Sequence, residues 1–305
     1  MTAPSGEKKM DCADSYYLLK NKYLSFFEKE LSNYLGNIKS VPQTLNCAVR
    51  YAVGEGGFGG KRIRPLLVFA VADLSGTGYK NAIEYALSIE FIHSYSLIHD
   101  DLPSMDNDDY RRGRFSTHKK FGEANAILTG DALNTLAFEV CLNKKEFSEN
   151  DWFALAEIGK YSGMNGMVGG QVCDLENENK ASDEKNLLSV YEGKTVGLIK
   201  ASVLSASRLS GGKYYDPLSD FAENYGLMFQ FTDDVLDVEG RLADIGKTPH
   251  KDADSGKLTS VAVFGLDGAK AKIKEFYENC LKALSEIPNS DFLKELTRET
   301  FSRNK

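Results

Sequence analysis

Five aspartates and three arginines gather in the stretch His93–Arg114. The aspartates fall within the ten residues Asp100–Asp109, directly after an apolar helical segment at Glu84–Ile98. Pro103 ends that helix, because proline lacks an amide hydrogen and disfavours helical geometry in the residue before it. An isolated acidic run is usually a solvated loop. In a folded site, acids this dense need neutralising cations, for which hard divalent metals are suited, and the arginines suit phosphate oxygens.

The rest of the chain shows helical spacing of apolar residues and no convincing strand with a hairpin turn. Glycines concentrate in the loop Gly54–Gly60, and Pro65 fits the first turn of the next helix. Together these patterns predict an all-α fold with a disordered tail at residues 1–15 and one domain at 16–305. Helices are predicted at 16–34, 43–53, 66–74, 84–99, 123–141, 152–170, 184–209, 217–238, 268–286 and 291–303.

Composition excludes several classes of protein. A net charge of −7 argues against nucleic acid or an anionic membrane as a bulk partner. Five scattered cysteines without a CxxC pair favour reduced thiols in a cytoplasmic protein over a disulfide framework or a zinc site. No window approaches the roughly 20 apolar residues of a membrane span, and the polar N-terminus lacks the apolar core of a signal peptide. A cytoplasmic protein with no stable membrane insertion is therefore expected.

A second acidic cluster, Asp233–Asp237, lies on the predicted helix 217–238. Asp233 and Asp237 are four residues apart, so they share one helical face at about 6 Å. A solvated face is one interpretation, but Phe229 and Leu236 continue an apolar stripe around these acids. Two such clusters facing each other across a bundle would hold several Mg²⁺ ions bridged by phosphate oxygens.

Basic residues recur where a diphosphate would need them. Lys61 and Arg64 follow the glycine loop at a helix start, where backbone N–H groups add anion affinity. Arg111 and Arg112 adjoin the first acidic cluster. Two more lysines lie in the pairs Lys194-Thr195 and Lys247-Thr248. Each is weak evidence alone, since most lysines are ordinary surface residues.

Several motifs together resemble the trans-isoprenyl diphosphate synthases, in that family's order and from about Tyr16 to the C-terminus; the bacterial farnesyl diphosphate synthases are the most similar branch. The motifs are GGKRIRP at 59–65, DDLPSMDND at 100–108 with RRG at 111–113, FGEANAILTGDAL at 121–133, GGQ at 169–171 with Asp174, GKT at 193–195, and FQFTDDVLD at 229–237 with Gly246-Lys247.

The resemblance implies about ten mostly antiparallel helices around a central cavity, a homodimer, and three Mg²⁺ ions. The residues that resemble the metal site are Asp100, Asp101, Asp106, Asp233 and Asp237. Those that resemble the isopentenyl diphosphate site are Lys61, Arg64, His93 and Arg112. Those that resemble the allylic diphosphate site are Arg111, Lys194, Thr195, Gln230 and Lys247, with Lys257 as a further candidate.

The expected chemistry suits these residue types. Breaking an allylic C–O bond releases diphosphate, which Mg²⁺, lysine and arginine stabilise. The allylic cation needs nearby dipoles and no water, and the oxygens of Thr195 and Gln230 supply such dipoles. The departing diphosphate can take the proton, so the chain needs no nucleophile–base pair. His93 also reads as an ordinary helix histidine when taken alone.

Product length is predicted from the residues before Asp100. Tyr95 and Ser96 stand five and four residues upstream. In the family that this chain resembles, a bulky aromatic residue five positions before the first aspartate forms the bottom of the cavity and stops elongation at fifteen carbons. Five residues on a helix correspond to a rotation of about 140° and a rise of about 7.5 Å. Spacing alone therefore does not show that Tyr95 points into the cavity, and an ordinary buried tyrosine is the alternative. A geranylgeranyl diphosphate synthase is the alternative within the family.

Other classes fit less well. A non-catalytic partner subunit of a heteromeric synthase usually lacks acids of one cluster, and both are complete here. A class I terpene cyclase lacks the GGKRxRP loop. A di-iron bundle needs a second unit like Glu90-x-x-His93, and a calcium loop needs a glycine and a terminal glutamate that Asp100–Asp108 lacks.

Overall fold

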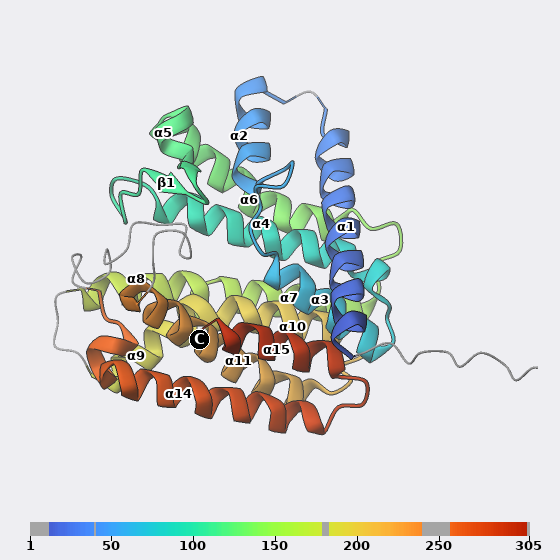
Figure 1. The fold of residues 1–305 in the computed structure, drawn as a ribbon. Coiled ribbons are helices and arrows are strands. Elements are labelled where there is room, and N and C mark those ends of the chain that lie inside the picture. The colour runs from blue at the N-terminus through green and yellow to red at the C-terminus, as the bar shows by residue number, and fades with distance from the viewer. Residues whose placement is uncertain (1–11, 40, 179–182, 240–256, 304–305) are drawn as a thin grey trace, which may run out of the picture.

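A computed structural model describes residues 12–39, 41–178, 183–239 and 257–303. Within these ranges the chain is almost entirely helical, which confirms the predicted all-α class (Figure 1). The elements are α1 (Cys12–Asn37), α2 (Gln43–Val53), α3 (Ile63–Ser75), η1 (Tyr79–Ala82), α4 (Ile83–Asp100), β1 (Tyr110–Arg111), β2 (Arg114–Phe115), α5 (Thr117–Phe121), α6 (Glu123–Leu142), α7 (Glu149–Ser162), α8 (Met167–Asn177), α9 (Glu184–Tyr191), η2 (Glu192–Val196), α10 (Gly197–Arg208), α11 (Tyr215–Glu239), α14 (Ser260–Ser285) and α15 (Asp291–Ser302).

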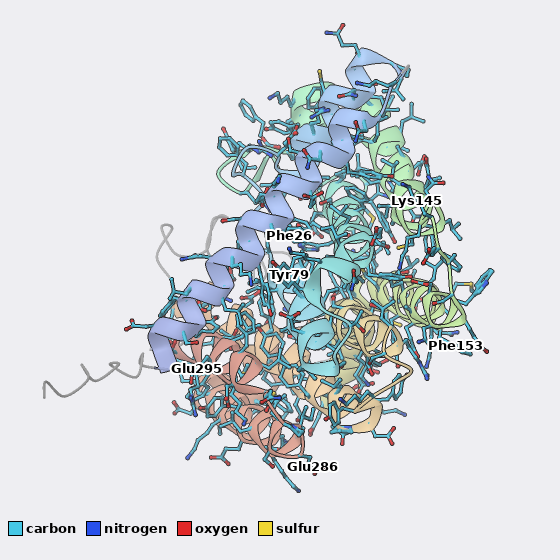
Figure 2. All side chains as sticks on the ribbon, turned by 90° about the vertical axis from the view of Figure 1, so that its right-hand side faces the viewer. Phe26, Tyr79, Lys145, Phe153, Glu286 and Glu295 are labelled. Atoms are coloured by element: carbon cyan, nitrogen blue, oxygen red, sulfur yellow. The ribbon has the colours of Figure 1, made fainter. Side chains whose placement is uncertain are left out.

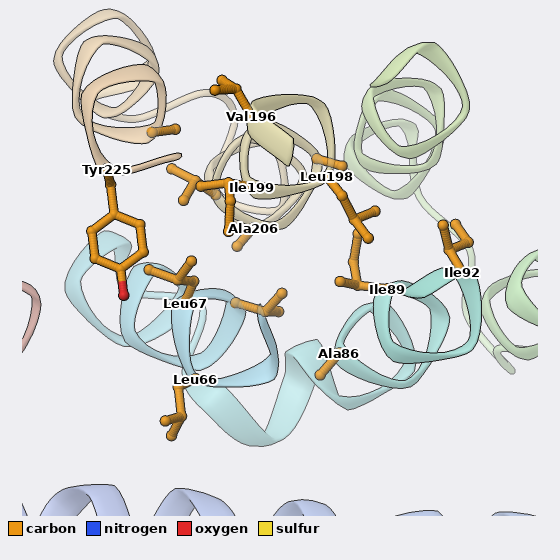
Figure 3. Close-up of a cluster of buried hydrophobic side chains, with 14 of the residues drawn as sticks. Leu66, Leu67, Ala86, Ile89, Ile92, Val196, Leu198, Ile199, Ala206 and Tyr225 are labelled. Carbon is orange, nitrogen blue, oxygen red and sulfur yellow. The ribbon is translucent and has the colours of Figure 1, made fainter. Parts of the chain in front are cut away.

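Helix α10 runs through the middle of the bundle and packs against α3, α7 and α11. Its residues from Gly197 to Ser207 are buried almost without exception, as expected of a helix that is covered on all sides. The buried Ser202 hydroxyl donates to the Leu198 carbonyl at 2.7 Å, so this polar group is satisfied within the helix. Figure 3 shows Leu198 pointing toward Ile89 of α4, which joins the centre to the helix that carries the first acidic cluster.

The remaining helices enclose this centre. Helix α4 lies along α6, and α11 lies along α14, on opposite sides of α10 (Figure 1). Helix α1 crosses the outside of the bundle, where Phe26 packs edge-on against Tyr79 with ring centroids 5.1 Å apart (Figure 2). The hairpin β1–β2, α8 and α9 gather at one end, to the left in Figure 1. No helix in the described ranges is both long and apolar enough to span a membrane.

Several elements differ from the prediction, and the predicted helix 184–209 is interrupted by the π-helical turn η2 between α9 and α10. The helix predicted at 152–170 is two helices, because the chain turns at Gly163–Gly166 and a Cβ at Gly166 would lie 2.0 Å from the Tyr161 carbonyl oxygen. Helix α14 begins at Ser260, not at 268, since the Thr259 hydroxyl caps its first turn and Gly265 absorbs a kink at φ 67°. A two-residue hairpin, which the sequence did not predict, pairs Arg111 with Arg114.

The predicted tail at 1–15 lies mostly outside the described residues, and α1 begins at Cys12 within it. Most of the segment 241–259, between the predicted helices 217–238 and 268–286, also lies outside them.

The buried carboxylate of Asp151 ties α7 to α4. Its oxygens accept hydrogen bonds from the Tyr85 hydroxyl at 2.6 Å, from Lys144 Nζ at 2.6 Å, and from Ser148 N and Oγ at 2.7 and 2.6 Å. Burial alone raises the pKa of Asp151, but these donors outweigh it and lower the pKa to about 2. The ionised form is therefore the one that stabilises the fold.

Replacing Asp151 by Ala is expected to lower the free energy of unfolding by about 3 kcal/mol, because buried donors lose their acceptor. The pKa falls from an ordinary 3.8 to about 2 on folding. The stabilisation is thus present above pH about 4 and disappears as the pH falls toward about 2. Urea unfolding across this range measures it. Asp151→Asn, which cannot ionise, should lack this pH dependence; an equal slope in both proteins would contradict the assignment.

Candidate active site

The first acidic cluster begins at the end of α4 and continues into the turn before the hairpin. The Asp106 N–H donates to the Asp100 carbonyl at 2.8 Å, and the Asp108 N–H donates to the Asp101 carbonyl at 3.2 Å. Asn107 adopts φ 48°, which lets the chain fold back. These bonds hold Asp106 close to the helix end, so the acids that are six residues apart belong to one site.

Arg111 crosses back from β1 onto this cluster. Its Nη2 lies 2.5 Å from Asp101 Oδ1 and 3.5 Å from Asp108 Oδ2. Burial lowers the pKa of Arg111, but the hydrogen bond to Asp101 and the charges of Asp101, Asp108 and Asp100 together outweigh burial, and the pKa is raised. The predicted diphosphate ligand Arg111 therefore neutralises an acid of the predicted metal site.

The second acidic cluster lies on α11. Asp233 Oδ1 lies 3.2 Å from Arg303 Nη2, which reaches it from the end of α15. The sequence offered no basic partner on α11 itself, and the tertiary fold provides one from 70 residues away. Asp237, one turn further on, is buried.

Two lysines complete the neutralisation. Lys257 Nζ lies 2.9 Å from Asp106 Oδ1, and Lys194 Nζ lies 2.6 Å from Asp174 Oδ2. Burial raises the pKa of Asp100, and the charge of Lys194 acts against that rise. Lys194 comes from η2 and Lys257 from the approach to α14, so residues far apart in sequence converge on the end of α4.

The predicted isopentenyl diphosphate residues also come together. Arg64 Nη1 lies 3.5 Å from His93 Nε2. Burial, and then Arg64 and Arg112, hold the pKa of His93 well below its usual value, so the imidazole is neutral. Arg112 adopts φ 54° and lies against Gly60 of the glycine loop, where a Cβ would be 3.4 Å from its Nε. Burial lowers the pKa of Lys61 as well.

A buried group of ion pairs, which the sequence did not predict, lies next to these basic residues. Arg62 is only 3% exposed and Glu90 only 1%. Arg62 Nη1 lies 2.5 Å from Glu90 Oε1, and Arg62 Nε lies 2.7 Å from Glu28 Oε1. Glu90 Oε1 also lies 3.8 Å from Arg112 Nη2. Glu90 could have indicated this ion pair from the sequence, because it lies inside the apolar segment of α4 and a buried charge requires a partner.

Lys194 and Thr195 lie on η2, a single π-helical turn between α9 and α10. Such turns interrupt the α-helical register and often occur at functional sites. Gly193 permits this one, since a Cβ there would lie 2.6 Å from Gly170 Cα of α8. The Thr195 hydroxyl donates to Gln230 Oε1 of α11 at 2.6 Å. The two predicted cation-stabilising residues are therefore in direct contact.

Tyr95 is buried on α4, with its ring edge-on to His99 at 5.9 Å between centroids. His99 Nε2 lies 3.2 Å from the Ile127 carbonyl oxygen of α6. The neighbouring Ser96 hydroxyl instead donates to the His93 carbonyl of its own helix at 2.9 Å. Lys247, the remaining predicted site residue, lies outside the described residues.

The acidic residues fit Mg²⁺ by their chemistry. They are carboxylates, the oxygen ligands that this ion prefers, and they already attract cations in the form of Arg111, Lys257 and Arg303. In the part of the chain that the structure describes, no three His, Cys, Asp or Glu side chains are gathered closely enough to hold a metal. Carboxylates that are paired with lysine and arginine would therefore have to reorient to hold this ion.

Comparison with known proteins agrees with this geometry. The family model described as polyprenyl synthetase matches residues 42–296. A farnesyl diphosphate synthase from Micrococcus luteus is 42% identical over 264 residues, which is 86% of this chain and 90% of that protein. A geranylgeranyl pyrophosphate synthase from Arabidopsis thaliana is 41% identical over 78% of this chain and 63% of that protein.

A solved geranyltransferase from Helicobacter pylori, complexed with magnesium and isoprenyl diphosphate, superposes with a TM-score of 0.82. It is 32% identical and covers 97% of this chain and 98% of its own. These relatives confirm the predicted prenyltransferase family and its isoprenoid synthase fold. The chain belongs to the polyprenyl synthetase family.

Proposed function

We propose that this prenyltransferase condenses dimethylallyl diphosphate and then geranyl diphosphate with isopentenyl diphosphate, which gives farnesyl diphosphate. The observation that carries the proposal is that Lys194, whose charge acts on Asp100 at the end of α4, is followed by Thr195, which donates to Gln230 Oε1. The Lys194 ammonium group can stabilise the leaving diphosphate, and the oxygens of Thr195 and Gln230 can stabilise the allylic cation. Ionisation of an allylic diphosphate requires both kinds of group. Relatives with this activity in their names support the fifteen-carbon product.

The metal residues in this proposal are Asp100, Asp101 and Asp106 on one side and Asp233 and Asp237 on the other. Bound Mg²⁺, for which we propose three ions, supplies Lewis-acid stabilisation of the departing diphosphate. Lys194, Arg111 and Lys257 would turn from their carboxylates toward the diphosphate oxygens. The same lysines and arginine would thus neutralise the carboxylates before the substrate binds and the diphosphate of the substrate afterwards.

Carbon–carbon bond formation follows from the remaining residues. The allylic C–O bond breaks with both electrons going to diphosphate, and the oxygens of Thr195 and Gln230 face the cation that is left. Lys61, Arg64 and Arg112 hold the diphosphate of isopentenyl diphosphate, and neutral His93 adds a hydrogen-bond donor. The isopentenyl double bond attacks the cation, and the departed diphosphate takes the released proton.

Tyr95 would set the product length. Its buried ring packs edge-on against His99 of the same helix, and His99 Nε2 lies 3.2 Å from the Ile127 carbonyl oxygen of α6. Ser96, whose hydroxyl is bonded to its own helix, would be a secondary wall. We infer that the domain responsible spans residues 16–305.

Incubation with both five-carbon substrates and Mg²⁺ is expected to give mainly fifteen-carbon product, and Tyr95→Ala is expected to shift the product to twenty carbons or more. Chromatographic sizing after dephosphorylation measures both. Absence of any product from the unmodified protein would favour a non-catalytic partner subunit. A twenty-carbon product from the unmodified protein would instead identify a geranylgeranyl diphosphate synthase and remove the role of Tyr95.

We also propose that the chain forms a homodimer. Helix α6 leaves Ile127 and Leu128 exposed, at 44% and 57%. These adjacent exposed aliphatic side chains would be covered in a protein–protein contact through α6. A monomer in sedimentation equilibrium would contradict this.

A further inference from the structure

Asp234 joins three helices through one buried carboxylate. The residue is 4% exposed. Its Oδ2 accepts from the Ser260 N–H at 2.7 Å and from the Ser260 hydroxyl at 2.6 Å, at the start of α14. The Tyr191 hydroxyl, at the end of α9, also donates to Oδ2. The other oxygen, Oδ1, accepts a hydrogen bond from Gln230 Nε2 on the same helix α11 at 3.0 Å.

This arrangement fixes which way the Gln230 amide points. Four donors surround the Asp234 carboxylate, which therefore acts as an acceptor at both oxygens, and the NH₂ group of Gln230 faces it. The carbonyl oxygen must then face the other way, where it accepts from the Thr195 hydroxyl at 2.6 Å. The negative end of the amide dipole therefore lies on the Thr195 side, which is the side where the allylic cation forms.

We propose that Asp234 is a positioning residue, which holds the Gln230 amide so that its oxygen, and not its NH₂ group, faces the allylic cation. The proposal rests on the proposed function, because it takes Thr195 and Gln230 as the residues beside that cation. Asp234 thereby has a different task from its neighbours Asp233 and Asp237 on α11. Those two are proposed metal ligands, whereas the Asp234 carboxylate bonds to Tyr191 and Ser260.

Asp234→Asn tests this with little change of shape. The Ser260 backbone N–H can only donate, so it selects the oxygen of the new amide and turns the Asn NH₂ group toward Gln230. Two NH₂ groups would then meet, and Gln230 must turn over to present its oxygen to Asn. The positive end of its dipole would face the cation, and kcat is expected to fall about a hundredfold. The KM for both substrates should change less than about threefold, because diphosphate binding is untouched.

Exchanging the two groups supplies the decisive variant. In Asp234→Asn with Gln230→Glu, the Glu carboxylate accepts both from the Asn NH₂ group and from the Thr195 hydroxyl, and the total charge is unchanged. The exchange is expected to raise kcat at least about tenfold above Asp234→Asn alone, a non-additive result typical of directly coupled residues. Gln230→Glu alone should be impaired, since it sets two carboxylates against each other.

Two control variants separate positioning from stability. Tyr191→Phe removes a donor from Asp234 but leaves the bond to Gln230, so it should lower the melting temperature and preserve kcat. Asp151→Asn makes the same substitution at a buried carboxylate elsewhere in the bundle and should also preserve kcat. The proposal fails if Asp234→Asn keeps wild-type kcat, if Tyr191→Phe loses as much kcat as Asp234→Asn, or if the exchange gives no recovery. An inactive unmodified protein would instead overturn the proposed function.

Discussion

Asp100→Ala is expected to lower kcat at least about a thousandfold while the circular dichroism spectrum stays helical. Metal stabilisation of a departing diphosphate contributes several kcal/mol, and Asp100 is one of the proposed metal residues, with Asp101 and Asp106 close by. The fold should tolerate the change, because burial raises the pKa of Asp100 and therefore disfavours its charged form in the metal-free protein. Steady-state assays across a Mg²⁺ titration measure the loss.

Asp109→Ala is the matched control for this experiment. Asp109 belongs to the same acidic stretch, but its side chain is 55% exposed and pairs with the exposed Lys119 at 2.8 Å. Its removal should leave kcat and the Mg²⁺ dependence unchanged. Full turnover in Asp100→Ala, or equal losses in the two variants, would show that the metal role is misassigned.

Lys194→Ala is expected to lower kcat about a hundredfold through loss of one charged donor to the leaving diphosphate. The KM of the allylic substrate should rise as well, because the ammonium group also attracts the bound substrate. Lys194→Arg should recover part of the loss, since it restores the charge but not the compact shape of the ammonium. Separate titrations of the allylic and isopentenyl substrates distinguish the two sites.

Lys200→Ala provides the comparison. Lys200 is on α10, six residues after Lys194, and pairs with Glu223 at 2.6 Å, the same distance as Lys194 to Asp174. The two substitutions therefore break similar ion pairs on adjoining segments. Only the one at Lys194 should reduce turnover; a comparable loss at Lys200 would point to destabilisation of the bundle instead.

Local patterns predicted much of this protein correctly. Helix α2 has the predicted bounds 43–53, because Pro42 and Gly54 mark its ends. Helix α4 ends at Asp100 in front of Pro103, as proline requires. Two predictions went wrong where segments distant in sequence approach each other, whereas the start of α14 was misplaced through the local Thr259 cap and the Gly265 kink. The turn between α7 and α8 and the π turn η2 depend on glycines whose backbones approach another segment: Gly166 approaches Gly197, and Gly193 approaches Gly170.

The residue types of the site, and the family to which they belong, follow from the sequence, because carboxylates, arginines and lysines at these spacings suit a metal-bound diphosphate whatever their exact placement. Their partners do not follow from it. Only the tertiary structure brings Arg303 to Asp233, Glu90 to Arg62, and Ser260 with Tyr191 to Asp234. A buried charge pairs with the oppositely charged group that helix packing places beside it, and that placement depends on how whole helices cross. Side-chain chemistry is thus local, whereas the direction in which the Gln230 dipole points is a property of the assembled bundle.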